Sequence, residues 1–289
     1  MQDTQSLVEE LRRQGIPEAE SLGTIAAPQY RLIATRSSLS NVPIGGTRFG
    51  GSPDVPNDFA WPHHRERPLT FLAQFDLSII RTKELPDCGW LLFFYDVAEQ
   101  PMGYDPIHKG GARVVHFDCP REELSRSEHP DVTSAGGPFE PCSLQVRHAV
   151  ALPDVNDRSL AEYIANGCES DTSRYRAHVH TLCDVTAAEP NHHLLGHPRL
   201  IQRDVRDQCQ LVTNGIYCGD PSGYKHPKAD SLLKDASNDW QLLLELDSDE
   251  AGPDWIWGNE GRIDYFIRRS DLLARAFDRS WLVLQCRNE

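Results

Sequence analysis

Three short patterns occur twice in this chain in the same order, and this repetition constrains the fold more than any single motif. They are G-x-P-x-apolar at 51–55 and 196–200, FLAQFD at 71–76 with LLLELD at 242–247, and a glycine before an apolar and aromatic strand at 89–94 and 261–266. The spacing between the second and third patterns differs by only about one residue between the two copies. We therefore predict an internal duplication.

The repetition predicts an α+β fold made of two mainly antiparallel β-sheet units with a few short helices, related by a pseudo-twofold axis. The expected segments are an N-terminal helix at 1–24, a first half at 25–125, a connecting region at 126–170, and a second half at 171–289 with an insertion at about 203–236. We expect these segments to form one compact unit.

Hydrophobic periodicity predicts the individual elements. In the stretch 69–77 apolar residues alternate, which places Phe71, Ala73 and Phe75 on one face and Leu72, Gln74 and Asp76 on the other. The continuous apolar run 89–97 predicts a strand covered on both faces. Further strands are expected at 30–35, 113–117, 144–152, 241–246, 262–268 and 281–286, and helices at 4–14, 158–166, 172–185 and 271–277.

Charge and hydropathy exclude some function classes. The 289 residues carry 29 basic and 43 acidic side chains, a formal net charge of -14, which argues against binding to the nucleic-acid backbone. No apolar run approaches the roughly 20 residues of a membrane-spanning helix, and the first residues are polar and acidic rather than signal-like. We therefore expect a cytoplasmic protein with neither a nucleic-acid nor a membrane partner, whose scattered cysteines are mostly reduced.

The ordered motifs resemble those of the YwqG-like family, a domain of unknown function. They are GGSPDVP, WP, FLAQFDL, LP and GWLLFFYD in the first half, then HLLGHPRLIQ, WQLLLELDSDE and WGNEGRIDYFI in the second. The similarity covers about residues 25–289. It implies an α+β, bacterial-type cytosolic protein without an established activity, and it supplies no catalytic residue. Glu245, where the family strand more often has glutamine, and the long N-terminal extension depart from the pattern.

Two equivalent strands carry a polar pair, Gln74 with Asp76 and Glu245 with Asp247. These side chains either end their strands in solvent or border a groove between the halves. Tryptophans near the repeated patterns favour binding, because large apolar groups in loops often contact ligands. The candidate ligand- or partner-binding residues are Arg48, Trp61, Gln74, Asp76, Gln202, Trp240, Glu245, Asp247 and Trp257. A groove with tryptophan walls and an acidic floor suits a peptide or a basic segment.

We predict no metal and no cofactor. The histidines at 192, 193 and 197 surround a glycine and a proline that interrupt a helix, and a second loose cluster is His178, His180 and Cys183. The acidic loop 247–258 begins like a calcium loop but has Gly258 where the bidentate glutamate is required.

The leading functional hypothesis is a non-catalytic binding or interaction protein that recognises a polypeptide partner or a small polar ligand in a groove between the halves. The alternative is a hydrolase or metal-assisted enzyme that uses a His, Asp, Glu or Cys set assembled across the halves. The sequence identifies no catalytic residue.

Overall fold

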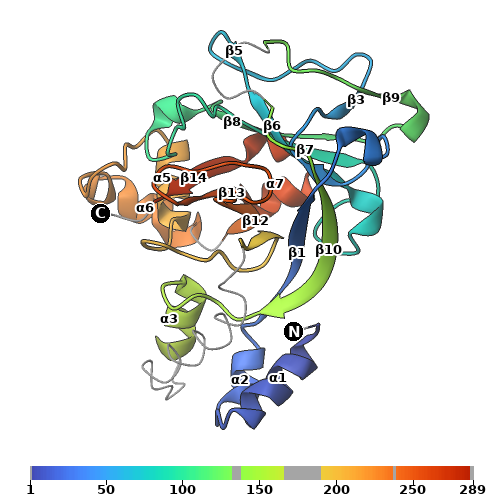
Figure 1. Cartoon of the computed structure of the whole chain (residues 1–289). Coiled ribbons are helices and arrows are strands. Elements are labelled where there is room, and N and C mark those ends of the chain that lie inside the picture. Colours follow the sequence, from blue (N-terminus) through green and yellow to red (C-terminus); the bar gives the residue numbers. More distant parts are fainter. Residues whose placement is uncertain (1, 132–137, 166–189, 237–238, 287–289) are drawn as a thin grey trace.

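A computed structural model describes residues 2–131, 138–165, 190–236 and 239–286 (Figure 1). It is a mixed fold in which a ten-stranded sheet has antiparallel pairing between all its neighbouring strands. The strands of this sheet are β1 Ala27–Arg36, β2 Arg48–Phe49, β6 Thr70–Asp76, β7 Trp90–Tyr95, β8 Ala112–Phe117, β10 Cys142–Ala151, β11 His192–Leu194, β12 Trp240–Asp247, β13 Arg262–Arg268 and β14 Trp281–Gln285. Two small two-stranded sheets are β3 Asp54–Pro56 with β9 Leu124–Arg126, and β4 His63–His64 with β5 Arg67–Pro68.

The strand order places one four-stranded group at each end of the sheet. The order is β14-β13-β12-β11-β1-β10-β2-β6-β7-β8, so strands from the second half form one end and strands from the first half form the other. Between them lie β1 and β10, which pair over ten residues and bend past both groups (Figure 1). The expected strands at 30–35 and 144–152 are these two central strands.

A register irregularity occurs in both groups. It lies between Phe71 and Ala73 where β6 pairs with β7, and between Leu242 and Leu244 where β12 pairs with β13. A β-bulge adds one residue and so reverses the facing of the side chains before it. Phe71 accordingly packs in an outer cluster, whereas Leu72 packs with Ala73 in the central core. The expected uniform alternation from 69 to 77 was therefore wrong at the bulge.

The central core joins the two halves. Its buried side chains come from β6 and β7 as well as from β12 and β13. The rings of Phe93 and Tyr265 are 5.0 Å apart, and the Tyr265 hydroxyl donates to the carbonyl of Phe94 at 3.0 Å. At the outer edges of the sheet, the Trp281 indole N–H donates to the Gly103 carbonyl at 2.8 Å. The ten strands therefore curl into a large, nearly closed sheet.

Different structures cover the outer faces of the two groups. Helices α5 Arg206–Thr213 and α6 Ala229–Ala236, from the expected insertion, cover the outer face of β12, β13 and β14. Loops that include β3 and β9 cover the outer face of β6 and β7. Both faces of β6 and β7, and of β12, β13 and β14, are thus largely buried, as the continuous apolar run of β7 predicts for that strand.

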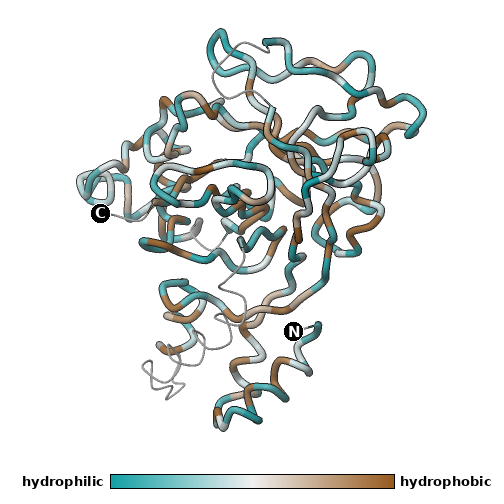
Figure 2. Tube along the Cα trace, in the orientation of Figure 1, coloured by the Kyte–Doolittle hydropathy of each residue, from teal (hydrophilic) through white to brown (hydrophobic). Residues whose placement is uncertain are grey.

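The N-terminal segment forms two helices rather than one, α1 Thr4–Arg13 and α2 Ala19–Gly23. Asp3 caps α1 by accepting from the backbone N–H of Ser6. Hydrophobic and hydrophilic stretches alternate along α1 in Figure 2, and its apolar side packs with Val150 and Leu160. Leu160 lies on α3 Arg158–Ala165, which agrees with the expected helix at 158–166.

The remaining short elements are α7 Arg269–Leu273 and the single 3-10 turns η1 Leu39–Asn41, η2 Leu77–Ile79, η3 Pro106–His108, η4 Arg121–Glu123, η5 Gly223–Lys225 and η6 Phe277–Arg279. α7 begins two residues before the expected helix at 271–277 and ends earlier. The helix expected at 172–185 lies outside the described residues. Among the described helices, none has both the length and the apolar character that crossing a bilayer requires.

Candidate functional site

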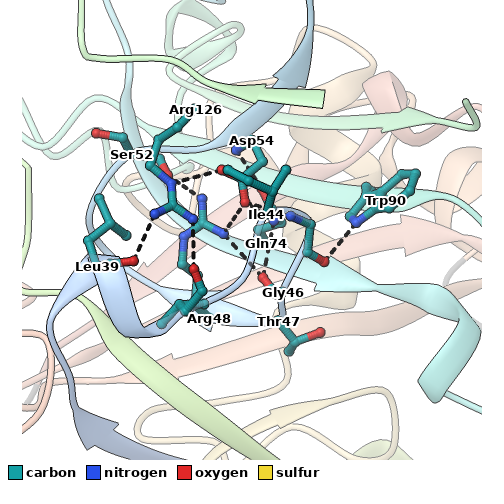
Figure 3. Close-up of polar contacts among 12 residues, drawn as sticks. Leu39, Ile44, Gly46, Thr47, Arg48, Ser52, Asp54, Gln74, Trp90 and Arg126 are labelled. Atoms are coloured by element: carbon teal, nitrogen blue, oxygen red, sulfur yellow. Dashed lines mark hydrogen bonds and ion pairs between the residues drawn. The ribbon is translucent and has the colours of Figure 1, made fainter. Parts of the chain in front are cut away.

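A fully buried ion pair organises the repeated G-x-P loop of the first half (Figure 3). Arg48 on β2 and Asp54 on β3 have no exposed side-chain surface, and their Nη1 and Oδ2 atoms are 2.7 Å apart. Arg126 Nε donates to the second oxygen of Asp54 at 2.9 Å. Burial alone would raise the pKa of Asp54, but the two arginines hold it below its ordinary value.

Gln74 completes this network. Its Oε1 accepts from the backbone N–H of Asp54 at 2.8 Å, and its Nε2 donates to the Gly46 carbonyl at 3.1 Å. Asp76 lies at the end of the same strand, where it accepts from the backbone N–H of Ser78 and pairs with Arg121. Gln74 and Asp76 therefore hold loops of the first half in place.

The second half contains a corresponding polar network around Arg199. Glu245 accepts from the Arg199 backbone N–H at 2.7 Å and from its Nε at 3.0 Å. Asp247 pairs with Arg199 and lies 3.5 Å from Arg262. Burial opposes ionisation of Asp247, but Arg262 and Arg199 lower its pKa. Among the described residues, no hydrogen bond or ion pair joins this network to the one around Asp54.

Two ionisable side chains beside Glu245 are buried and incompletely bonded. Asp264 lies opposite Glu245 on the neighbouring strand and accepts from Gln285 Nε2 at 2.7 Å, while its Oδ1 has no hydrogen-bond partner among the residues that the structure describes. Burial, together with the charge of Glu245, raises the pKa of Asp264 well above its ordinary value. Burial lowers the pKa of His193, whose Nδ1 lies 3.8 Å from Glu245. Both groups are thus stabilised in their uncharged forms.

The predicted aromatic residues take structural positions. Trp240 is buried, donates to Gln210 Oε1 at 2.9 Å and lies beneath Arg268. Trp257 is fully buried in the central core, and Trp61 packs against the outer face of β7 near Phe94. Gln202 donates to the carbonyl of Cys286 at 3.1 Å. Whether any of the nine predicted residues binds a ligand stays a prediction.

A cavity of about 690 Å³ lies between the two halves, near the outer edges of the sheet. One wall comes from the loop 101–111 and the start of β8, and the other from the end of α5 and the start of β14. The lining side chains are Tyr95, Pro101, Pro106, His108, Lys109, Ala112, Arg113, Val212, Thr213, Arg268, Asp278, Arg279, Ser280, Trp281 and Leu282. None of the nine predicted residues lines this cavity, and Trp240 lines a smaller one of about 310 Å³.

The larger cavity is rich in positive charge. Four of its lining side chains are cationic, Lys109, Arg113, Arg268 and Arg279, and one, Asp278, is acidic. The sequence analysis missed these residues because they share no motif and come from four separate segments. Their only sequence signal is position, since Arg113 and Arg268 lie near the ends of strong strand patterns.

The histidines that the sequence analysis weighed as metal ligands, and for which it predicted no metal, have protein partners in the structure. His192 Nε2 lies 3.2 Å from Asp249, and His197 Nε2 donates to the Ile25 carbonyl at 2.8 Å. His178, His180 and Cys183 lie outside the described residues. A different group, His64, Asp96 and Glu99, places ligand-type atoms within 4.8 Å of one another, although Arg67 pairs with both carboxylates.

A comparison with protein families finds one that matches most of the chain. The model described as a domain of unknown function, DUF1963, matches residues 47–286. A search of curated proteins finds no match. The matched region includes the cavity and both arginine–carboxylate networks, whereas α1, α2 and β1 precede it.

Proposed function

The chain belongs to the family described as a domain of unknown function, DUF1963, and from this premise we propose that it is a non-catalytic binding protein for a small polar ligand. The ligand occupies the larger cavity between the halves. Residues of this cavity bind and orient it, while the networks around Asp54 and Arg199 hold the surrounding loops.

One observation carries this proposal: the cavity has walls from both halves and a volume suited to a small molecule. Ligand sites commonly enclose about 300–1,000 Å³ and combine apolar walls with a few convergent polar groups. The cavity has about 690 Å³, and its lining includes the ring of Trp281 and four cationic side chains. Its position between two structural units is also typical of ligand sites.

We further propose that the two halves are duplicates related by a pseudo-twofold axis. Three observations support this duplication: the strand order, the register irregularity in both β6 and β12, and an equivalent hydrogen bond within each half. The backbone N–H of Asp54 bonds to Gln74, and that of Arg199 bonds to Glu245, at the same place in the repeated patterns. The YwqG-like motifs and the acidic composition support assignment to that group and to the cytoplasm.

The binding proposal is tested by filling the cavity. Ser280 lines the cavity and donates to the carbonyl three residues earlier, as does Ser231 on the exposed side of α6. Ligand-observed NMR with small aromatic anions, cations and neutral molecules measures binding to the wild type, Ser280→Trp and Ser231→Trp. We expect fragments that bind the wild type and Ser231→Trp but not Ser280→Trp. Absence of any such fragment overturns the proposal.

A metal-assisted hydrolase is the second candidate, favoured by the proximity of His64, Asp96 and Glu99. His64 is buried, and its Nδ1 lies 2.8 Å from Asp96 Oδ2, an arrangement that orients an imidazole for proton transfer. Hydrolysis of p-nitrophenyl phosphate that requires Mn²⁺ and is lost in His64→Ala would favour the enzyme over the binding protein.

A further inference from the structure

We propose that the ligand of the larger cavity is an organic dianion with an apolar body, such as a phosphate monoester or a dicarboxylate. This inference rests on the proposed function, and it adds the chemical class of the ligand. The class follows from the charge of the two walls, from how their cations are held, and from the aromatic ring of Trp281 in the second-half wall.

The cavity has an excess of positive charge in a strongly acidic protein. The chain carries a net charge of -14, yet four cations line this cavity. The carboxylates that line it or pair with those cations are Asp278 and Asp271. A ligand with two negative charges balances the remaining excess, whereas a cationic ligand meets repulsion.

Neighbouring side chains hold the arginine of the second-half wall in position. The Arg268 guanidinium lies 4.5 Å from the centre of the Trp240 ring and donates to Gln210 and Thr213 at 3.2 and 3.0 Å. Its nearest carboxylate, Asp271, is 3.7 Å away and pairs more closely with Arg279, at 2.9 Å. Asp271 thus pairs with two guanidiniums. The positive charge of Arg268, whose position is fixed, is therefore only partly neutralised.

The first-half wall supplies two further cations, Lys109 and Arg113. Arg113 lies on β8 opposite Phe94, and Lys109 follows the turn η3. Within the described part of the chain, neither forms an ion pair. Arg113 is partly buried at the edge of the sheet, so its charge is less screened than a fully exposed one. Cations on opposite walls can bind the two charges of one ligand.

The second-half wall also contains a fixed aromatic ring. The Trp281 indole N–H is already bonded to the Gly103 carbonyl, which holds the ring in place as an apolar surface of this wall. An apolar body in contact with this surface is removed from water, whereas a bare inorganic ion leaves it unfilled. The ligand therefore combines anionic oxygens with a hydrophobic part.

The test measures binding of phenyl phosphate, phthalate, benzyl alcohol and benzamidine by titration calorimetry at pH 7.5. We expect the wild type to bind a dianion at least tenfold more tightly than the alcohol, and not to bind benzamidine. Arg113→Gln should weaken dianion binding about tenfold or more, because it removes a charge-assisted hydrogen bond. The matched control Arg81→Gln, which removes an exposed cation elsewhere, should change it less than twofold.

The outcomes separate this inference from the proposed function. Tighter binding of phenyl phosphate than of phthalate identifies a phosphate monoester, and the reverse identifies a dicarboxylate. If benzyl alcohol binds as tightly as both dianions and Ser280→Trp abolishes its binding, the ligand class is wrong and the cavity remains the site. If Ser280→Trp affects no probe, the proposed function itself fails. If Arg113→Gln does not fold, the salt dependence of wild-type binding replaces this variant. Dianion binding that does not weaken with added NaCl then overturns the inference.

Discussion

Arg48 and Asp54 illustrate how a buried charge constrains the surrounding chain. Neither side chain has exposed surface, and together with Gln74 they satisfy backbone groups at positions 45, 52 and 54, before and after β2. Removing one partner of a buried ion pair leaves the other charge unpaired in a poorly solvating interior. The pair therefore fixes the conformation of the loop, even though pairing itself adds little net stability.

We expect Asp54→Asn to lower the free energy of unfolding by about 3–5 kcal/mol, because Arg48 then remains buried without a carboxylate. Urea denaturation measures the change. The exposed Asp58→Asn, a chemically identical substitution four residues away, should change it by less than about 0.5 kcal/mol. Equal effects of the two substitutions contradict the buried ion pair.

Asp264 makes the stability of the protein depend on pH in an unusual direction. Its pKa is raised in the folded chain, whereas an unfolded aspartate ionises at about pH 4. Above that pH the unfolded chain releases the proton and the folded chain keeps it, so this group favours unfolding as the pH rises.

Asp264→Asn has no proton to release, so its stability relative to the wild type should increase from pH 4.5 to pH 8. We expect a relative gain of more than about 1 kcal/mol, since one unit of pKa shift corresponds to about 1.4 kcal/mol. Urea denaturation at both pH values measures it, with the exposed Asp87→Asn as control. A constant difference between variant and wild type shows that Asp264 ionises equally in both states.

The polar residues of β6 and β12 were predictable, but their partners were not. Alternation with apolar neighbours distinguishes Gln74 and Glu245 within their strands. Asp54, which bonds to Gln74, lies 20 residues away from it in the sequence, and Arg199, which bonds to Glu245, lies 46 residues away, and nothing local indicates either pairing. Sequence periodicity therefore indicated polar groups on a strand face, and it could not show which buried groups they bond to.

At the scale of elements, the β-bulges decide which layer each strand residue enters. The strand locations were predictable from apolar patterns, but a bulge leaves no clear pattern because both faces of β6 are buried. The consequence is that Phe71, rather than Leu72, shares the outer layer with Phe94, with ring centres 5.6 Å apart.

A double-mutant cycle tests this arrangement. We expect a coupling energy of about 0.5–1.5 kcal/mol between Phe71→Ala and Phe94→Ala, the usual value for an aromatic pair. Leu72→Ala and Phe94→Ala should be additive within about 0.5 kcal/mol, because a layer of strands separates the side chains. Urea denaturation of the single and double variants measures these coupling energies. Coupling of Leu72 with Phe94, and none of Phe71 with Phe94, would show that side chains alternate along β6 without a bulge.

At the scale of the whole molecule, the shared core joins parts of the chain that are distant in sequence. Leu72 and Leu243, each at a bulge, pack in the same cluster. The repeated patterns predicted two related groups of strands. They could not predict the larger cavity, because its cations lie outside the repeats and meet only after the sheet curls.

The position of β1 has a consequence for synthesis on the ribosome. β1 occupies the middle of the sheet, but its partners β10 and β11 begin at residues 142 and 192, whereas the strands of the first-half group follow β1 directly. At about 5–20 residues per second, β1 waits on the order of ten seconds for β10 to be made. During this interval the nascent chain exposes an unpaired strand, so the step most vulnerable to aggregation precedes completion of the second half.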